Sequence, residues 1–334
     1  MRGAALLALP LLLLTAGCST KPGGSGSATG GGSGAGLPPL AKKASYKVGF
    51  SQVESNNPWR IAETKSMRDE AAKRGDQIVV TDATGSPAKQ IADVSNMIAQ
   101  RVDMIFLAPH SEKPLAPVVL QAKRAGIPVI LVDRRVDPSI AKPGQDYVTF
   151  IGSDFVQQGK EAADWLIKES GGKAKIIELE GNTGSSPAID RKKGFDDEIK
   201  SQPGMQIVAS QPADFAREKG RQVTETLLQA HPDVTAVYAH NDEMALGAVV
   251  ALQAAGKQPG KAVQVISIDG GREALQAIID GKMNFVVQSS PFFGPVAFDT
   301  MKQYANGDKI PDWVVVKDKT FDKANAKAEI GNAF

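Results

Sequence analysis

The stretch MIFLAPHSEKPLAPVVLQAKRAGIPVILVDR, residues 104–134, decides the fold class. Its two apolar runs, 104–107 and 129–132, have the length of buried strands. The amphipathic segment 116–125 lies between them and is followed by Gly126 and Pro128, which end helices. A strand, a helix and a second strand in this order predict a parallel βαβ unit.

The same alternation continues in both directions along the chain. Further helices are expected at 61–73 and 88–100, and the second series of strands follows Ser153. The other predicted strands are 48–50, 78–80 and 148–151 in the first series, and 176–179, 207–209, 234–238, 263–266 and 285–287 in the second. The pattern predicts an α/β protein of two similar lobes, each with a parallel sheet flanked by helices.

Domain boundaries follow from the two series. We expect the N-terminal lobe to comprise residues 46–152 plus 289–319, and the C-terminal lobe residues 153–288 plus 320–334. Strands that cross near Ser153, near Gln288 and at 318–322 would form a three-strand hinge between the lobes. At residue level the two series show no tandem repeat.

The N-terminus predicts export. Arg2 precedes an apolar run at 4–16 that is too short for a stable membrane anchor, and Ala16 and Gly17 stand directly before Cys18. Residues 1–17 are therefore interpreted as a lipoprotein signal peptide, with Cys18 as the lipidated mature N-terminus. An ordinary cleaved signal peptide is the alternative. The Gly/Ser-rich residues 18–45 predict a flexible tether that holds the body on the periplasmic or extracellular face of a membrane.

Composition narrows the function further. The formal charge of the 334 residues is +2, which gives no reason to expect a nucleic-acid partner. One cysteine excludes an intrachain disulfide, and the three histidines lack metal-ligand spacing, so neither a metal nor another cofactor is expected. The chain has no GxxxxGK[ST] loop, so any energy for transport must come from a partner.

Polar residues gather just after the predicted strands, for example at Asp133, Asn241 and Asp269. In open α/β sheets ligands bind at the carboxyl ends of strands, so two facing lobes would place these loops along one cleft. A neutral polyol needs bidentate hydrogen-bonding groups and an aromatic face. The residues that supply both are Asp133 and Asp269 as acceptors, Arg134 and Arg191 as donors, Asn57, Asn241 and Gln288 as either, and Trp59 and Phe215 as aromatic faces.

Each of these residues has a plainer interpretation. Asp133 and Asp269 can belong to simple turns, Trp59 and Phe215 can be core residues, and Arg191 can lie on an exposed helix face. For the pair Asn241-Asp242, we expect Asp242 to cap a helix and Asn241 to reach the cleft.

Several segments resemble the ribose and galactose type of bacterial periplasmic sugar-binding protein, over residues of about 46 to 319. They are Asn56-Asn57-Pro58-Trp59, Val132-Asp133-Arg134, SQPADF at 210–215, AHPDV at 230–234, NDEMALGA at 241–248 and Ile268-Asp269-Gly270. The resemblance implies a type I periplasmic-binding-protein fold, a monomer, and delivery of a sugar to an ABC permease with its ATPase subunits. It also implies hydrogen-bonding roles for Asn57, Asp133, Arg134, Arg191, Asn241, Asp269 and Gln288, and stacking roles for Trp59 and Phe215.

Within that family, the segments 48–53, 59–64, 188–195 and 267–270 are most similar to the galactofuranose-binding branch. Ribose binders carry two consecutive aromatic residues where this chain has Trp59 and Arg60. A furanose with an exocyclic tail would offer hydroxyls to Arg60, so galactofuranose or a related furanose is the expected ligand. The residues Ser51, Asp190 and Asp214 are also expected to line the cleft.

Other functions stay open at this point. Galactose, ribose, arabinose or inositol are alternative ligands, and transport can be combined with chemoreception. A DNA-binding repressor shares the fold, but the secretion signal and the absence of a helix-turn-helix segment before residue 46 argue against it. A sugar-processing enzyme would need a carboxylate pair such as Asp133 and Asp269, which neighbouring arginines are expected to keep ionised as acceptors. We therefore expect a binding protein and not an enzyme.

Overall fold

The computed structural model describes residues 36–334. The expected signal peptide at 1–17, the lipidation candidate Cys18 and the tether up to residue 35 lie outside the described residues. None of the helices between Gly36 and Phe334 combines the length and the apolar character that crossing a membrane requires.

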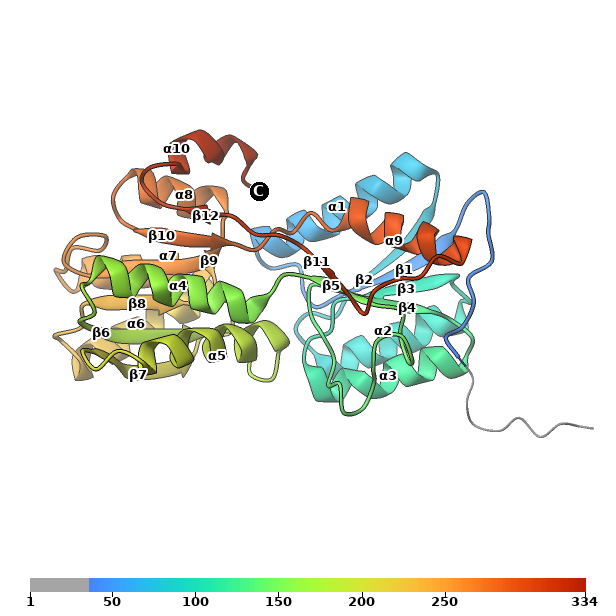
Figure 1. Cartoon of the computed structure of the whole chain (residues 1–334), viewed down its shortest axis with the longest axis horizontal. Coiled ribbons are helices and arrows are strands. Elements are labelled where there is room, and N and C mark those ends of the chain that lie inside the picture. The colour runs from blue at the N-terminus through green and yellow to red at the C-terminus, as the bar shows by residue number, and fades with distance from the viewer. Residues whose placement is uncertain (1–35) are drawn as a thin grey trace, which may run out of the picture. The chain divides into compact units, whose positions relative to one another are not determined.

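The first lobe is built on a six-stranded sheet with four helices packed on it (Figure 1). Its elements are β1 (Lys47–Gln52), α1 (Pro58–Arg74), β2 (Gln77–Asp82), α2 (Pro87–Ala99), β3 (Met104–Leu107), α3 (Glu112–Arg124), β4 (Val129–Val132), β5 (Phe150–Gly152), α9 (Gly294–Asn306) and β11 (Trp313–Val315).

The second lobe repeats this architecture. Its elements are α4 (Phe155–Glu169), β6 (Ala174–Glu180), α5 (Ser186–Lys200), β7 (Met205–Pro212), α6 (Arg217–Ala230), β8 (Ala236–Ala239), α7 (Asp242–Ala254), β9 (Gln264–Asp269), α8 (Arg272–Ile279), β10 (Phe285–Gln288), β12 (Thr320–Phe321), α10 (Ala326–Glu329) and a 3₁₀ turn at Ile330–Asn332. The predicted class of two α/β lobes is confirmed, and every predicted strand is present, with ends that match or are shifted by at most three residues.

The two sheets have equivalent strand orders. The first runs β11-β5-β4-β3-β1-β2 and the second β12-β10-β9-β8-β6-β7, and all their pairings are parallel except that of β10 with β12. In both sheets the order reverses direction after the first strand in sequence, β1 or β6, which is the topological switch point of a doubly wound sheet. Loops that follow these strands are therefore the expected place for a ligand.

Successive side chains of a strand point to opposite faces of the sheet, and in this protein helices cover both faces. In β3, Met104 and Phe106 pack under α1 and α9, whereas Ile105 and Leu107 pack under α2 and α3. The second sheet is covered in the same way, by α4 and α5 on one face and by α6, α7 and α8 on the other. Because both faces of each sheet are buried, the strands are apolar at nearly every position, which is why they were recognisable in the sequence.

The chain passes between the lobes three times: between β5 and α4, between β10 and α9, and between β11 and β12. The crossing segments are hydrogen-bonded to one another. Val316 N donates to Gly152 O over 3.0 Å, and Gln288 N donates to Lys319 O over 2.8 Å. The three-strand hinge expected from the sequence is thus present as a connected group of strands.

Two features of the first lobe were not predicted. The short strand β11 pairs with the edge strand β5, and its three residues are too few to show a hydrophobic period. Residues 38–45, expected to be the end of the tether, pack on the body: Leu40 is buried in the core beside α9, and Pro38 O accepts a hydrogen bond of 2.7 Å from the Tyr304 hydroxyl.

Close helix packing yields a stability prediction. A Cβ atom on Gly247 in α7 would lie 2.1 Å from Arg217 O in α6, so we expect Gly247→Ala to destabilise the fold by about 1–3 kcal/mol despite the better helix propensity of alanine. Urea denaturation would measure it. Gly331→Ala is the matched control, since no heavy atom lies within 4 Å of its Cβ position. Equal stability of the two variants would contradict this account of the helix contact.

Candidate functional site

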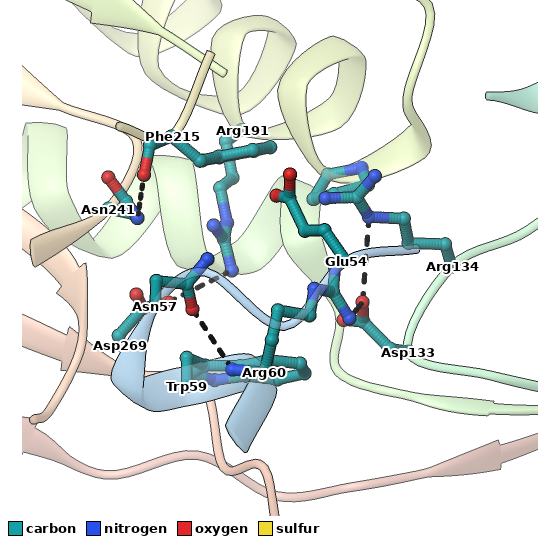
Figure 2. A pocket seen from close by; sticks show the side chains of 11 residues that line it. Glu54, Asn57, Trp59, Arg60, Asp133, Arg134, Arg191, Phe215, Asn241 and Asp269 are labelled. Atoms are coloured by element: carbon teal, nitrogen blue, oxygen red, sulfur yellow. Dashed lines mark hydrogen bonds and ion pairs between the residues drawn. The ribbon is translucent and has the colours of Figure 1, made fainter. Parts of the chain in front are cut away.

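A pocket of about 350 Å³ lies between loops of the two lobes, at the carboxyl ends of their strands. This volume includes space that is open to solvent, so it is an upper bound on the room for a ligand. The lining residues are Glu54, Asn57, Trp59, Arg60, Asp133, Arg134, Pro187, Arg191, Phe215, Asn241 and Asp269 (Figure 2).

The lobes also touch beside the pocket. Glu112 N donates to Gly184 O over 2.9 Å, Arg135 N donates to Ser186 Oγ over 2.9 Å, and Arg134 Nη2 donates to Asn182 Oδ1 over 3.3 Å. In this structure the lobes are therefore closed around the pocket.

The end of β4 places two charged residues in the pocket. Asp133 has a left-handed backbone (φ 61°), a conformation that aspartate tolerates better than most residues, and Arg134 beside it is 2% exposed. Arg134 Nη1 donates to His110 O over 3.0 Å, while its Nε is buried with no hydrogen-bond partner in the described part of the chain. Burial, together with the charge of Arg60, lowers the pKa of Arg134 to about 9, so the group is still a cation at neutral pH.

Arg60 belongs to a buried ion cluster at the start of α1. Its Nη1 atom lies 2.8 Å from Glu63 Oε2 and 2.7 Å from Asp133 Oδ2, and its guanidinium lies 4.6 Å from the centre of the Trp59 ring. Burial alone would lower the pKa of Arg60, but the charges of Asp133 and Glu63 outweigh it and raise the pKa. Burial raises the pKa of Glu63 to about 7, against the opposing charge of Arg60.

The Phe215 ring, from the second lobe, forms one side of the pocket. Phe215 also has a left-handed backbone (φ 59°), unusual for a bulky residue, and its ring lies against Gly181 at the end of β6. A Cβ at position 181 would lie 1.9 Å from Phe215 Cζ, so only glycine leaves room for this ring.

Asn241 both caps α7 and lines the pocket. Its Oδ1 accepts from Met244 N over 3.0 Å, and its Nδ2 donates to Phe215 O over 3.2 Å. The prediction that Asp242 is the cap was wrong: Asp242 is the first helical residue, and its carboxylate accepts from Ser267 Oγ and from the amides of Gly270 and Gly271. Asp242 thereby holds the loop that carries Asp269.

Arg191 projects from α5 with its charge directed into the pocket. Its Nε donates to Gln158 Oε1 over 2.9 Å, its Nη1 donates to His240 O over 2.6 Å, and its Nη2 lies 3.9 Å from Asp269 Oδ1. The exposed-helix interpretation of Arg191 is therefore wrong, because the side chain is 4% exposed.

Asp269 ends β9 with an unusual backbone (φ 141°). Burial, followed by the charge of Asp242, raises the pKa of Asp269 well above its usual range, although Arg191 opposes this. At Asp269 burial therefore opposes the effect expected of the arginines, and Arg191 Nη2 lies 3.9 Å from its Oδ1. A protonated Asp269 can donate as well as accept a hydrogen bond.

Four predicted residues lie outside the lining. Gln288 turns toward the hinge, where its Oε1 accepts from Lys319 N over 3.3 Å. Ser51 is fully buried under the pocket floor, with no hydrogen-bond partner for its Oγ among residues 36–334. Asp190 pairs with Arg135 across the cleft, and Asp214 pairs with Lys219.

Two lining residues were missed by sequence reasoning. Glu54 lies two residues beyond the end of β1, and its Oε2 accepts from Asn56 Nδ2 over 2.9 Å. Pro187 lies in the first turn of α5, and its apolar ring gave no chemical signal. Between Gly36 and Phe334, no cluster of three or more His, Cys, Asp or Glu side chains is arranged to hold a metal ion.

Comparison with known proteins identifies the class. A family model described as "Periplasmic binding protein domain" matches residues 48–309. "Galactofuranose-binding protein YtfQ" from Escherichia coli (strain K12) is 40% identical over 285 residues, which cover 84% of this chain and 89% of that protein. The chain belongs to the periplasmic binding protein family, whose members bind solutes outside the cytoplasmic membrane.

Two similar solved structures contain sugars in the furanose form. A Mycobacterium smegmatis protein in complex with β-D-fucofuranose has 41% sequence identity and a TM-score of 0.82, covering 86% of this chain and 94% of its own. The binding component of the arabinose ABC transporter from Shewanella sp. ANA-3, bound to α- and β-L-arabinofuranose, has 39% identity and a TM-score of 0.81, covering 86% and 95%. The resemblance to sugar-binding proteins of the galactofuranose type is confirmed.

The contact between Gly181 and Phe215 can be tested by a double-mutant cycle. We expect Gly181→Ala to cost about 1–3 kcal/mol in the free energy of unfolding, because the Phe215 ring must move. In a Phe215→Ala background the same change should cost little, since the obstructing ring is gone. Urea denaturation of the four proteins measures both values, and the same cost in both backgrounds would refute the contact.

His240, whose backbone O accepts from Arg191, is itself held by a buried contact with Glu178. Glu178 Oε1 lies 3.0 Å from His240 Nε2, and Glu178 Oε2 binds Lys192. Gly181 N donates to His240 Nδ1 over 3.3 Å, which leaves His240 Nε2 to donate to Glu178. Burial tends to raise the pKa of Glu178, but His240 and Lys192 outweigh it and lower the pKa to about 2.

This arrangement predicts an acid-sensitive stabilisation. Since the pKa of Glu178 is lower in the folded protein than in the unfolded chain, its contribution is complete above about pH 4.5 and is lost as the pH falls toward 2. We expect Glu178→Gln to reduce the free energy of unfolding by about 3 kcal/mol at pH 7, and by progressively less below about pH 4.5. Urea denaturation at pH 7, 4.5 and 3.5 measures the difference, and a constant difference across these values would contradict the assignment.

Proposed function

We propose that this protein captures one monosaccharide, in its furanose form, in the pocket between the lobes and delivers it to an ABC importer. The observation that carries the proposal is the composition of the pocket. Two aromatic rings, Trp59 and Phe215, come from opposite lobes, and the polar groups between them are planar guanidinium, carboxylate and amide groups. Such groups bind adjacent hydroxyls in pairs while the rings cover the C–H faces of a sugar.

The hydrogen-bonding capacity of the pocket fits a neutral polyol. Arg134 Nε is a buried donor that makes no hydrogen bond in the described part of the chain and lies 3.5 Å from Asp133 Oδ2, and a ligand hydroxyl would accept from it. Asp133 offers acceptor oxygens, Asn57 and Asn241 offer both kinds of group, and Asp269 can do both if it is protonated. We assign binding roles to these residues and to Trp59, Arg60, Arg191 and Phe215.

A furanose is favoured over a pyranose by two considerations. Relatives with about 40% identity are named for galactofuranose or were solved with fucofuranose or arabinofuranose. In this chain Arg60 lines the pocket with its guanidinium over the Trp59 ring, and we assign to it the exocyclic hydroxyls of a furanose. Galactofuranose is our first choice, with arabinofuranose next; ribose, galactose and inositol are the remaining candidates.

Delivery depends on closure. A ligand that contacts both lobes favours the closed form, because only that form offers all its contacts. We propose that a permease with its ATPase subunits recognises the closed protein, that chemoreception can use the same form, and that the protein acts as a monomer. The lobes are proposed to comprise 46–152 plus 289–319 and 153–288 plus 320–334, with a lipid on Cys18 and a tether from residue 18 holding them at the membrane.

We infer that the pocket performs no catalysis. Of the three lining carboxylates, Asp133 and Asp269 face arginines, and Glu54 accepts a hydrogen bond from Asn56. The family to which the chain belongs binds solutes. Incubation with a nitrophenyl galactofuranoside is expected to release no nitrophenol, and steady release would overturn this inference.

The ligand can be identified by thermal stabilisation. The mature protein, stripped of ligand by unfolding and refolding, is heated with methyl galactofuranoside, methyl L-arabinofuranoside, methyl galactopyranoside, ribose, glucose or myo-inositol, because the ring form of a free sugar interconverts in water whereas that of a methyl glycoside is fixed. A ligand at about 100 times its Kd adds about 2.7 kcal/mol of stability, so its Tm shift is readily measured. A shift with furanoses alone is expected. A shift only with a pyranose or inositol would retain the binding function and overturn the furanose, and no shift with any sugar would overturn sugar binding.

The role of Arg60 needs a paired design, because removing Arg60 alone leaves Glu63 buried without its counter-charge. We expect the double variant Arg60→Phe/Glu63→Gln to bind galactofuranose at least about tenfold more weakly than the Glu63→Gln control, since a hydrogen bond to a charged group contributes about 1.5–3 kcal/mol. Titration calorimetry measures both. Equal affinities would show that Arg60 does not bind the ligand.

A further inference from the structure

One buried side chain, Gln158, connects the pocket to the hinge. It lies in the first turn of α4, directly after the first crossing segment, and is 1% exposed. Its Oε1 accepts from Arg191 Nε over 2.9 Å. Its Nε2 donates to Gln288 O over 3.1 Å and to Asp318 Oδ2 over 2.8 Å.

These partners lie on different crossing segments. Gln288 ends β10 at the second crossing, and Asp318 lies between β11 and β12 in the third. Asp318 Oδ1 in turn accepts from Ser153 Oγ over 3.1 Å, and Ser153 belongs to the first crossing. One carboxamide and one carboxylate thus tie all three crossings together.

The carboxamide of Gln158 also determines which nitrogen atom of Arg191 remains available in the pocket. Of the three guanidinium nitrogens, Nε is held by Gln158 and Nη1 by His240 O, so Nη2 is the atom left nearest to Asp269 in the pocket. The bond to Gln158 therefore fixes the plane of the guanidinium. A rotation of the crossing segments that moves Gln158 must also move Arg191.

We propose that Gln158 is a positioning residue that couples Arg191 to the three crossing segments, so that the pocket has its binding geometry only when the hinge has its closed geometry. This rests on the proposed function in that ligand binding is what closes the lobes. Gln158 does not itself line the pocket, so it would act through Arg191 and Asp318.

A merely structural role would look different. A buried glutamine that only fills space would lower stability when replaced, and would alter exchange only in its own helix turn. Coupling requires that distant crossing segments respond as well. The charged groups that face Asp318 are Arg191 and Glu161; burial raises the pKa of Asp318 to about 6, and bonds from Gln158 and Ser153 oppose this. At pH 8 Asp318 is therefore a carboxylate.

The first experiment needs no ligand. Hydrogen exchange is measured by mass spectrometry on the ligand-free mature protein, its Gln158→Leu variant and the control Gln157→Leu. Gln157 is the adjacent, exposed glutamine, whose Nε2 donates to Glu161 Oε1 within the same helix. We expect Gln158→Leu to increase exchange about tenfold or more in peptides that cover 152–158, 288–293 and 315–320. An increase confined to 152–158 would overturn the coupling, as would an equal effect of Gln157→Leu.

The second experiment uses a charge swap at pH 8. Gln158→Glu places a second carboxylate against Asp318, and repulsion should weaken sugar binding about tenfold or more. Adding Asp318→Asn to the same chain restores a donor opposite the introduced carboxylate, so the double variant is expected to recover to within about threefold of wild type. At pH 5, where the two carboxyl groups can share a proton, the single variant should also recover part of its affinity.

The outcomes separate the two proposals. If wild type binds no sugar, the proposed function fails, and the exchange data alone decide whether Gln158 couples the crossings. If wild type binds a sugar but Gln158→Glu binds equally well, or the double variant binds no better than the single, the coupling is overturned and the function stands.

Discussion

Three guanidinium groups, those of Arg60, Arg134 and Arg191, are buried around one small pocket, and the surrounding structure is organised to keep them charged. A buried cation without a partner is costly, so each must be matched by a carboxylate, a carbonyl or a dipole. Asp133 and Glu63 serve Arg60, while backbone carbonyls of His110 and His240 serve Arg134 and Arg191. The carbonyl partners of Arg134 and Arg191 carry no full charge, so a ligand oxygen that accepts from either guanidinium would stabilise it further.

The loops around the pocket also carry strained backbone. Asp133 and Phe215 adopt left-handed conformations where their loops turn. Such conformations persist when neighbouring packing determines them, as Gly181 does for Phe215. Binding geometry is thus stored in the fold before a ligand arrives, which reduces the ordering cost of binding.

The fold could be predicted from the sequence more completely than the contacts of the pocket residues, because the two leave different patterns in the sequence. Strands buried on both faces stand out as apolar runs, so the two-lobe fold and the residues just beyond each strand end, such as Asp133 and Asp269, followed from the sequence. Hydrogen-bond partners did not, because they depend on side-chain direction. Asn241 and Asp242 are adjacent and chemically alike, and only the fold shows that the first caps the helix while the second holds the loop before α8. Gln288 has the right position at the end of β10, but its side chain turns to the hinge and away from the pocket.

Some contacts that stabilise the closed form join the lobes directly and need no ligand. The bonds from Arg134 to Asn182 and from Arg135 to Ser186 join the lobes directly, and Arg135 adds an ion pair with Asp190. A ligand must bind the closed form about 10⁴-fold better than the open form to move the population from 1:99 to 99:1, so direct contacts between lobes reduce the bias that the ligand has to supply. The direct contacts have a second consequence. A protein that closes without a ligand would resemble one that holds a ligand, so a partner that recognises the closed form could not distinguish the two. Arg134 adds a contribution that depends on the ligand. Its Nε makes no hydrogen bond within residues 36–334 and lies 3.5 Å from Asp133 Oδ2. A ligand hydroxyl that accepts from Nε would stabilise the closed form in a way that the direct contacts between the lobes do not.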